Sequence, residues 1–231
     1  MEPPPPRYPE THRSLLRRVP ARGTHERAVI DAILDAGLVA HVGFVEGDQP
    51  LVLPMVYVRR DDGLVLHGAR AGRLLKTLAA QVAACVTVTL LDGLVLARSA
   101  FHHSVNYRSV VAFGTARELA GTAKRDAMEA LIERLAPGRS ALVRPPSAKE
   151  LDATAVLSFA IEEASAKRRS GGPIDEEEDL AWPVWAGHVP LRSAAMAPVA
   201  APGIGAAFAP PAIVSGTGDS SDAHPSGDDL A

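Results

Sequence analysis

This sequence has little of what marks several specialised classes of protein. It contains one cysteine in 231 residues, so no internal disulfide can form, and the apolar run around Cys85 favours a small buried side chain. The net charge is −3, so there is no electrostatic reason to expect nucleic-acid binding. No apolar run reaches the length of about 20 residues that a transmembrane helix needs. These absences favour an ordinary soluble, globular protein.

Motifs of nucleotide binding and of secretion are missing as well. The sequence has no Gly-x-Gly-x-x-Gly and no Gly-Lys-Ser/Thr, so the markers of dinucleotide folds and P-loops are absent. The first residues are acidic and proline-rich rather than basic and then apolar. We therefore expect no signal peptide and a cytoplasmic protein.

The two ends differ in composition from the middle. Prolines crowd residues 1–10, and residues from about 194 onward are rich in Ala, Pro, Gly and Ser. Neither segment can bury enough apolar surface to offset chain entropy. We predict an N-terminal arm (1–20) with a disordered Pro-rich start, one domain (21–193) and a disordered tail (194–231). The domain is long enough to bury roughly 70% of its unfolded-chain surface.

The hydrophobic pattern of the middle predicts several strands, most of them joined by hairpins. The strands expected are residues 38–45, 51–58, 64–67, 84–91, 94–99, 109–119 and 154–162, with turns at Gly47-Asp48 and Asp92-Gly93. Helices are expected after Thr24 as far as Gly37, over 73–83, from Thr122 to 137 with a buried stripe of Met128, Leu131, Ile132 and Leu135, and briefly after Ser147. This order predicts a mainly β fold, an antiparallel barrel of six to seven strands with peripheral helices.

The segment HGARAGRLLKTL, residues 67–78, combines a strand end, a glycine turn and a helix start. The first backbone N–H groups of a helix and its dipole favour a bound phosphate. Arg70, Arg73 and Lys76 add positive charge. A phosphate site and an ordinary basic, solvated helix face both explain this segment.

Residues 101–108, FHHSVNYR, place polar and aromatic side chains between two predicted strands. They could line a cofactor or substrate cleft, with Tyr107 stacking and Arg108 balancing negative charge, or form a solvated connection. Adjacent His102 and His103 lack an accompanying cysteine or carboxylate pattern, so we expect no metal site.

The two tryptophans follow an acidic run, residues 175–179, that we interpret as a solvated linker. Aromatic residues make up only 4% of the chain, and each tryptophan can bury 150–250 Å². We expect Trp182 and Trp185 to pack on the barrel or across a dimer, or else in the core of the subunit itself.

Four segments together resemble a known family: 53–57 (LPMVY), 67–76, 97–111 and 185–191. The chain resembles the FMN-binding split-barrel proteins of the pyridoxamine 5′-phosphate oxidase-like superfamily, and within it the nitroimidazole-resistance-type flavoproteins. The resemblance implies a homodimer with FMN at the subunit interface and a small-molecule substrate. It also implies cofactor contacts from Pro54, Met55, Val56, Tyr57, His67, Gly68, Arg73, Lys76, Ser104, Asn106, Tyr107, Arg108, Ser109 and Trp185. His67 is in addition a candidate substrate contact, with a structural histidine as the alternative.

The sequence departs from the oxidase pattern at two places. The phosphate turn reads Gly72-Arg73-Leu74 instead of Ser-Arg-Lys, and the C-terminal end offers only His188 and Arg192 as basic residues for a substrate phosphate. The function implied is an FMN-dependent oxidoreductase, oxidase-like or nitroreductase-like. The alternatives are a non-catalytic flavin carrier or stress-response protein, and a barrel that holds FAD, F420 or haem.

Overall fold

The structure, a computed structural model, describes residues 5–204, 209–211 and 213. The predicted disorder of the first four residues and of most of the tail lies outside this range. Within it, residues 192–204 form neither helix nor strand. No helix of the described residues combines the length and the apolar character that crossing a membrane requires.

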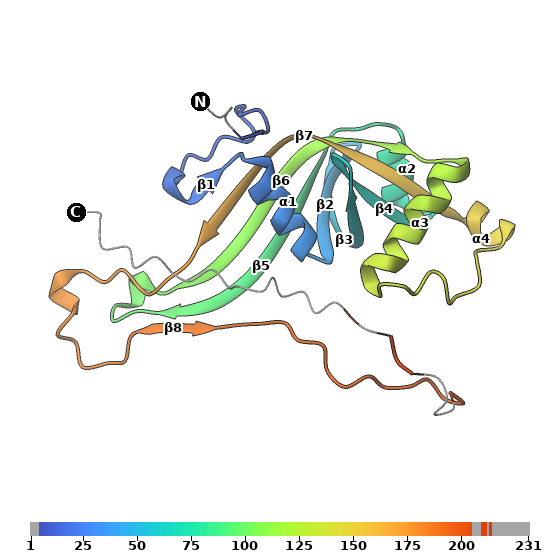
Figure 1. Cartoon of the computed structure of the whole chain (residues 1–231). Helices are drawn as coiled ribbons and strands as arrows, with labels where there is room; N and C mark the ends of the chain where they lie inside the picture. The colour runs from blue at the N-terminus through green and yellow to red at the C-terminus, as the bar shows by residue number, and fades with distance from the viewer. Residues whose placement is uncertain (1–4, 205–208, 212, 214–231) are drawn as a thin grey trace.

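Six antiparallel strands close into a ring of pairings (Figure 1). They are β2 (Val39–Glu46), β3 (Gln49–Arg60), β4 (Gly63–Ala69), β5 (Ala84–Leu96), β6 (Ser104–Glu118) and β7 (Thr154–Arg169). The order is β7-β4-β3-β2-β5-β6, and β6 pairs with β7 to complete the ring. Two short strands are added at its margins, β1 (Gly23–Thr24) on β7 and β8 (Gly187–Pro190) on β5. The predicted split-barrel fold is confirmed.

Helices cover the barrel without entering the ring. They are α1 (Arg27–Ala36), α2 (Arg73–Ala79), α3 (Gly121–Leu135) and α4 (Ala148–Ala153), with 3-10 turns η1 (Pro20–Arg22), η2 (Ala100–His102) and η3 (Glu177–Asp179). The core lies inside the barrel and under α1 and α2, and includes Ile30, Leu34, Tyr57, Leu66, Leu75, Leu78, Val86, Leu157 and Phe159. A smaller apolar cluster under α3 joins Val65, Ala127, Leu131 and Val156.

The predicted hairpin at Asp92-Gly93 is wrong, because β5 runs straight through it from residue 84 to residue 96 with only a register shift. The partners of the two residues explain the continuity. Asp92 accepts a two-pronged hydrogen bond from Arg108 on β6, at 2.9 and 2.8 Å. A Cβ on Gly93 would lie 2.9 Å from the carbonyl oxygen of Val189, so the glycine admits β8 rather than a turn.

Helix ends differ from the predictions in two places, and the predicted cap at Ser147 is confirmed. Glu26, not Thr24, precedes α1. The second helix ends at Ala79 rather than at residue 83, because Gln81 takes a left-handed backbone (φ 58°) and its N–H closes onto Leu78 at 3.0 Å. The capping box at Ser147 is present as a full reciprocal pair with Glu150.

The buried face of α3 is rotated from the predicted stripe. It carries Lys124, Ala127 and Leu131, whereas Leu135 is exposed. The Lys124 ammonium group donates to the carbonyls of Leu151 and Thr154, each at 2.6 Å. These bonds turn the helix toward α4 and the start of β7.

The outer halves of β5 and β6 continue beyond the barrel with β8 and the end of β7 as an arm, which extends to one side in Figure 1. We define the arm as residues 91–109, 168–174 and 187–190. Because β6 already begins at Ser104, the expected polar connection 101–108 is mostly strand. Trp182 and Trp185, 65% and 62% exposed, lie beside it, so burial in the core of the subunit itself is wrong for both.

Candidate functional site

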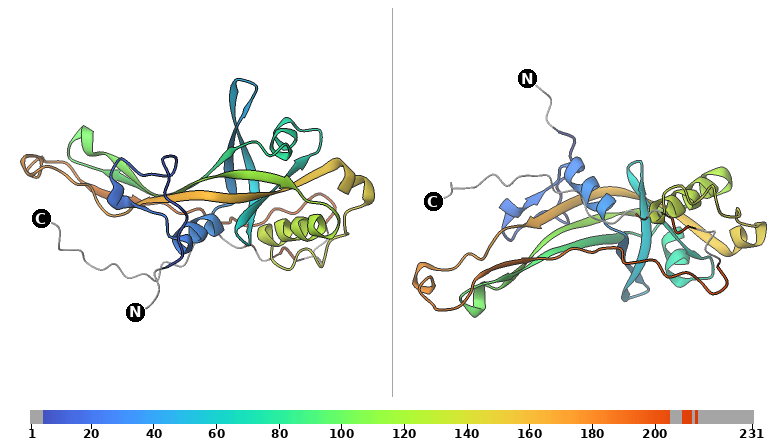
Figure 2. Two further views of the ribbon diagram at one scale, coloured as in Figure 1. Left: turned by 90° about the horizontal axis from the view of Figure 1, so that it is seen from above. Right: turned by 60° about the horizontal axis from the view of Figure 1, so that its bottom comes forward.

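The candidate site is the place where the backbones of β3 and β4 part, a separation of strands that we call the cleft. The two strands pair only over 57–60 with 63–66. Beyond Tyr57, β3 continues with β2 alone, and beyond Leu66, β4 continues with β7 alone. The β2–β3 hairpin therefore rises away from the sheet next to α2 (Figure 2, left). This separation leaves one edge of β3, residues 50–56, without a strand partner among the described residues.

The polar groups on this open edge follow from the pairing with β2. The N–H of Tyr57 donates to the carbonyl of Leu38 at 3.4 Å, so odd-numbered residues of β3 face β2 and even-numbered ones face the open edge. Two of the even positions are Pro50 and Pro54, which have no N–H. The edge thus offers carbonyl oxygens throughout but N–H donors only at Val52 and Val56.

His67 lies on the β4 side of the cleft, opposite Val156 of β7. It is half-buried, and its Nδ1 is buried without a hydrogen-bond partner among the described residues. Burial lowers the pKa of His67 from its usual 6.5, so the ring is neutral at pH 7. A neutral imidazole with an unused buried nitrogen is available to a ligand.

Glycines shape the turn between β4 and α2. A Cβ on Gly68 would lie 3.1 Å from Leu75 of α2, and one on Gly72 would lie 2.9 Å from the carbonyl oxygen of Ala69. The backbone can therefore make this turn only with small residues. Gly72 also precedes the first residue of α2, as the sequence predicted.

The cations of this turn differ in how far they are already neutralised. Arg70 pairs with Glu118 at 2.7 Å, and the Nε of exposed Arg73 lies 3.6 Å from a carboxylate oxygen of Glu46. Lys76 is exposed and has no ion pair within the described part of the chain. Arg73 and Lys76 thus remain accessible to an anion at the turn.

The residues of segment 53–57 divide between the two faces of β3. Met55 and Tyr57 point into the barrel, where the Tyr57 hydroxyl donates to the carbonyl of Leu34 at 2.5 Å. Burial raises the pKa of Tyr57. Pro54 and Val56 lie on the outer face, so only these two present side chains on the outside of the cleft.

The other predicted contacts lie on the arm. Asn106 is buried, donates to Gly171 at 3.0 Å and accepts from Arg169 at 2.5 Å. Arg108 is held by Asp92, so its charge is already balanced. The hydroxyl of Ser109 donates to the carbonyl of Lys167 at 3.3 Å, whereas Trp185 is exposed. Ser104 and Tyr107 pair with β5.

Within one chain, the predicted contacts on the arm lie far from the predicted contacts on β3, β4 and α2. His67 lies opposite Val156 and Tyr107 lies opposite Arg169 on the same strand β7. Thirteen residues of strand separate Val156 from Arg169, which corresponds to roughly 40 Å. The predicted site residues therefore form two clusters: the cleft cluster, Pro54–Tyr57 with His67, Gly68, Arg73 and Lys76, and the arm cluster, Ser104 and Asn106–Ser109 with Trp185.

Sequence reasoning missed two features of functional interest. The open edge of β3 was hidden because pairing between strands is non-local, although prolines spaced four apart in a strand are a recognisable sign of an edge. A hollow lined by Arg22 and Arg169 joins residues 147 positions apart, which no local pattern connects. Among the described residues, no three His, Cys, Asp or Glu side chains are grouped to hold a metal ion.

Comparison with known proteins identifies the family. The family profile described as pyridoxamine 5′-phosphate oxidase matches residues 26–168. No curated protein matches the chain. The flavocytochrome Anf3 from Azotobacter vinelandii is 40% identical, with 87% of this chain and 94% of that chain covered and a TM-score of 0.81.

Two further solved structures are similar. The FAD and haem binding protein from Mycobacterium smegmatis is 40% identical over 82% of this chain and 94% of its own, with a TM-score of 0.79. A putative 5-nitroimidazole antibiotic resistance protein from Bacteroides thetaiotaomicron shares the fold at 19% identity, 63% and 85% coverage and a TM-score of 0.53. The profile match and the two relatives at 40% identity show that this chain belongs to the pyridoxamine 5′-phosphate oxidase family.

Proposed function

We propose that this protein is a flavin-binding redox protein that holds the isoalloxazine ring against the open edge of β3 and the first phosphate at the turn before Arg73. The observation that carries the proposal is the edge itself, a stretch of β3 backbone without a strand partner in the described part of the chain. The N–H of Val56 and the carbonyl of Pro54 are suited to the alternating acceptors and donors along one edge of the ring. The flavin would supply the electron transfer, and the protein would supply binding and orientation.

The nucleotide could be FMN, as the sequence resemblance implies, or FAD. Both carry the same ring and the same first phosphate, so the edge and the turn suit either one. The relative from M. smegmatis is named for FAD and is 40% identical, which favours FAD here. An oxidoreductase that passes electrons from a reduced donor to a small organic substrate is the activity that we propose.

We also propose that the protein works as a homodimer. Apolar side chains on and beside the arm are exposed in the single chain, among them Leu91, Phe101, Ile174, Leu180, Trp182 and Trp185. Exposed apolar side chains in such number usually mark an interface. An arm that crosses to a second copy would bring the arm cluster of one protomer toward the cleft cluster of its partner.

A haem group is a second candidate, because the two relatives at 40% identity are named a flavocytochrome and an FAD and haem binding protein. His67 fits the requirement for an axial ligand, since its ring is neutral and one nitrogen is unused. The outer face of β2 and β3 beside it exposes Val39, Val45 and Val52, which suits an apolar macrocycle. We propose His67 as the haem ligand, with flavin retained at the edge.

The absorbance spectrum of the purified protein tests both groups, and mass spectrometry of the nucleotide released by heating tells FMN from FAD. Arg73→Gln should weaken flavin binding about 10- to 100-fold, the loss of one charge-assisted phosphate contact. Arg139→Gln removes an exposed charge elsewhere and is the matched control. His67→Gln should remove the haem absorbance band and leave the flavin spectrum. A colourless protein that takes up neither FMN nor FAD would contradict the proposal.

A further inference from the structure

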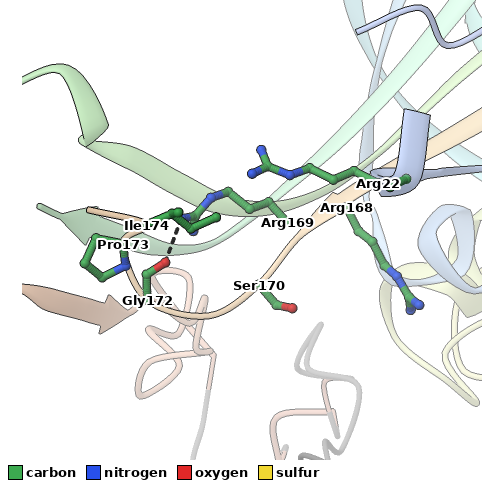
Figure 3. Close-up of a pocket in the computed structure, with 8 residues that line it drawn as sticks. Arg22, Arg168, Arg169, Ser170, Gly172, Pro173 and Ile174 are labelled. Carbon is green, nitrogen blue, oxygen red and sulfur yellow. Dashed lines mark hydrogen bonds between the residues drawn. The ribbon is translucent and has the colours of Figure 1, made fainter. Parts of the chain in front are cut away.

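A hollow of about 450 Å³ lies at the far end of β7, between η1 and the loop that follows the strand (Figure 3). Arg22 of η1 and Arg169, the last residue of β7, both line it. Its position is roughly 40 Å along β7 from the cleft cluster of the same chain. The proposed flavin site of that chain therefore leaves this hollow unexplained.

Arg169 is a buried cation with no counter-charge among the described residues. It is 7% exposed, and within the described part of the chain its guanidinium group donates to neutral oxygens alone, those of Asn106 at 2.5 Å, Gly171 at 3.2 Å and Gly172 at 2.7 Å. These bonds use three of its five N–H donors. Burying a charge is costly unless an opposite charge compensates it. The protein thus holds a desolvated guanidinium group beside a hollow large enough for a small molecule.

A second guanidinium group, that of Arg22, adds to this positive charge. Burial lowers the pKa of Arg169, and repulsion from Arg22 lowers it further. Figure 3 shows both side chains extending in the same direction. In the described part of the chain neither arginine has an ion-pair partner, and the acidic residue of the adjacent loop, Asp175, is taken by Arg98 at 2.8 Å. Two like charges held together without an acid favour an anion between them.

Arg168 contributes to the rim only. Successive residues of a strand point to opposite faces, and Figure 3 shows the Arg168 side chain directed away from the other two. The rest of the lining is partly apolar, through Ala21, Pro173 and Ile174, with Ser170 as a neutral polar group. An anionic group attached to a carbon skeleton matches this combination better than a bare ion.

We propose that this hollow binds the phosphate or diphosphate group of a small organic molecule through Arg22 and Arg169. The planar guanidinium group recognises phosphate oxygens in pairs, and a volume of this size is typical of small-molecule sites. The diphosphate belongs either to a nicotinamide dinucleotide that delivers electrons or to the flavin of a partner chain. Both molecules would present the same diphosphate group to the two arginines.

Titration calorimetry of the full-length protein with inorganic pyrophosphate at constant ionic strength tests the site. The wild-type protein should bind pyrophosphate, and Arg22→Gln should bind it at least about tenfold more weakly, because one of two charged contacts is lost. Arg22 is not buried, so this variant should fold. Arg17→Gln removes an exposed charge that does not line the hollow and should bind like the wild type. No binding by the wild type in either its flavin-loaded or its flavin-free form, or equal weakening by both variants, would overturn the proposal.

Two further titrations identify the source of the phosphate. If the ligand is a nicotinamide dinucleotide, NADPH should compete with pyrophosphate in the flavin-loaded protein, and Arg22→Gln should leave the flavin spectrum unchanged. If the ligand is the flavin of a partner chain, only flavin-free protein should bind pyrophosphate, and Arg22→Gln should lower FAD retention. A site that binds pyrophosphate but is insensitive to both nucleotides in both forms would contradict the assignment to an organic phosphate. The flavin proposal is decided separately, by colour and by Arg73→Gln.

Discussion

The hydroxyl of Tyr57 on β3 donates to the carbonyl of Leu34 near the end of α1, at 2.5 Å in the middle of the core. A helix leaves its last carbonyls without internal partners. Tyr57 satisfies one of them, and Arg134 of α3 donates to that of Asp35 and to the carbonyl of Gly37, the residue that follows the helix. The end of α1 is thus fastened by side chains from two other elements.

Tyr57→Phe removes this bond and leaves a buried carbonyl without a partner. We expect the free energy of unfolding to fall by about 1–2 kcal/mol. Urea denaturation followed by circular dichroism measures the change. Tyr8→Phe is the control, because the Tyr8 ring is buried against Arg27 but its hydroxyl makes no hydrogen bond within the described residues. An equal loss in both variants, or a loss of flavin in Tyr57→Phe, would argue against this role.

His67 should make stability depend on pH in the weakly acidic range. Burial lowers its pKa in the folded protein below the usual 6.5. As the pH falls below 6.5, the unfolded chain gains a proton that the folded chain does not yet take up, so stability decreases until the folded pKa is passed. Above pH 6.5 the effect disappears because both states are neutral.

The measurement is urea denaturation at several pH values across this range. His67→Gln should show a smaller loss of stability between pH 6.5 and the acid end than the wild type. His41→Gln, which removes an exposed histidine of β2, should behave like the wild type. A pH profile that does not change in His67→Gln would contradict the burial effect.

Lys124 should stabilise the junction of α3, α4 and β7. It is 7% exposed and donates to two carbonyls, and a bond from a charged donor contributes about 1.5–3 kcal/mol. Lys124→Met retains most of the apolar volume but leaves both oxygens unpaired, so we expect a loss of about 2 kcal/mol. Amide hydrogen exchange should also speed up in α4. The exposed Lys149→Met, on α4 itself, should change neither quantity.

The open edge of β3 makes a specific prediction for flavin binding. Val56→Pro removes one of its two N–H donors without touching the ladder to β2, whose donors are the odd-numbered residues. We expect flavin affinity to fall about tenfold, corresponding to one lost hydrogen bond of about 1.4 kcal/mol. Val52→Pro makes the same backbone change farther from His67 and serves as the control. Equal flavin retention in both variants would place the ring elsewhere.

The sequence predicts the barrel well because its strands carry a local signal. Alternating apolar residues and the Gly47-Asp48 turn define β2 and β3, and the glycine turn at Gly68 and Gly72 lies where it was expected. The prediction of a turn at Asp92-Gly93 is wrong because both residues contact distant parts of the chain: Asp92 accepts from Arg108, and Gly93 allows the close approach of Val189. A turn signal and a close contact between strands use the same residue types.

The candidate site is less accessible to sequence reasoning for the same physical reason. The cleft cluster is contiguous enough to be recognised, but its defining property, the separation of β3 from β4, depends on which strands pair. The arm cluster is predicted as a cofactor contact, yet in the structure Asn106 and Arg108 hold other parts of the chain. Its distance from the cleft follows only from the length of β7.

Pro50 and Pro54 also reduce the risk of aggregation. An unpaired strand edge can form backbone hydrogen bonds with a strand of another polypeptide, which is the first step toward fibrous aggregates. Because Pro50 and Pro54 have no N–H, every second donor along this edge is missing, and a foreign strand cannot form a full ladder of hydrogen bonds with it. A short planar molecule can still bind to the donors that remain. The prolines thus protect the margin of β3 against polymerisation and leave it open to the flavin that we propose there.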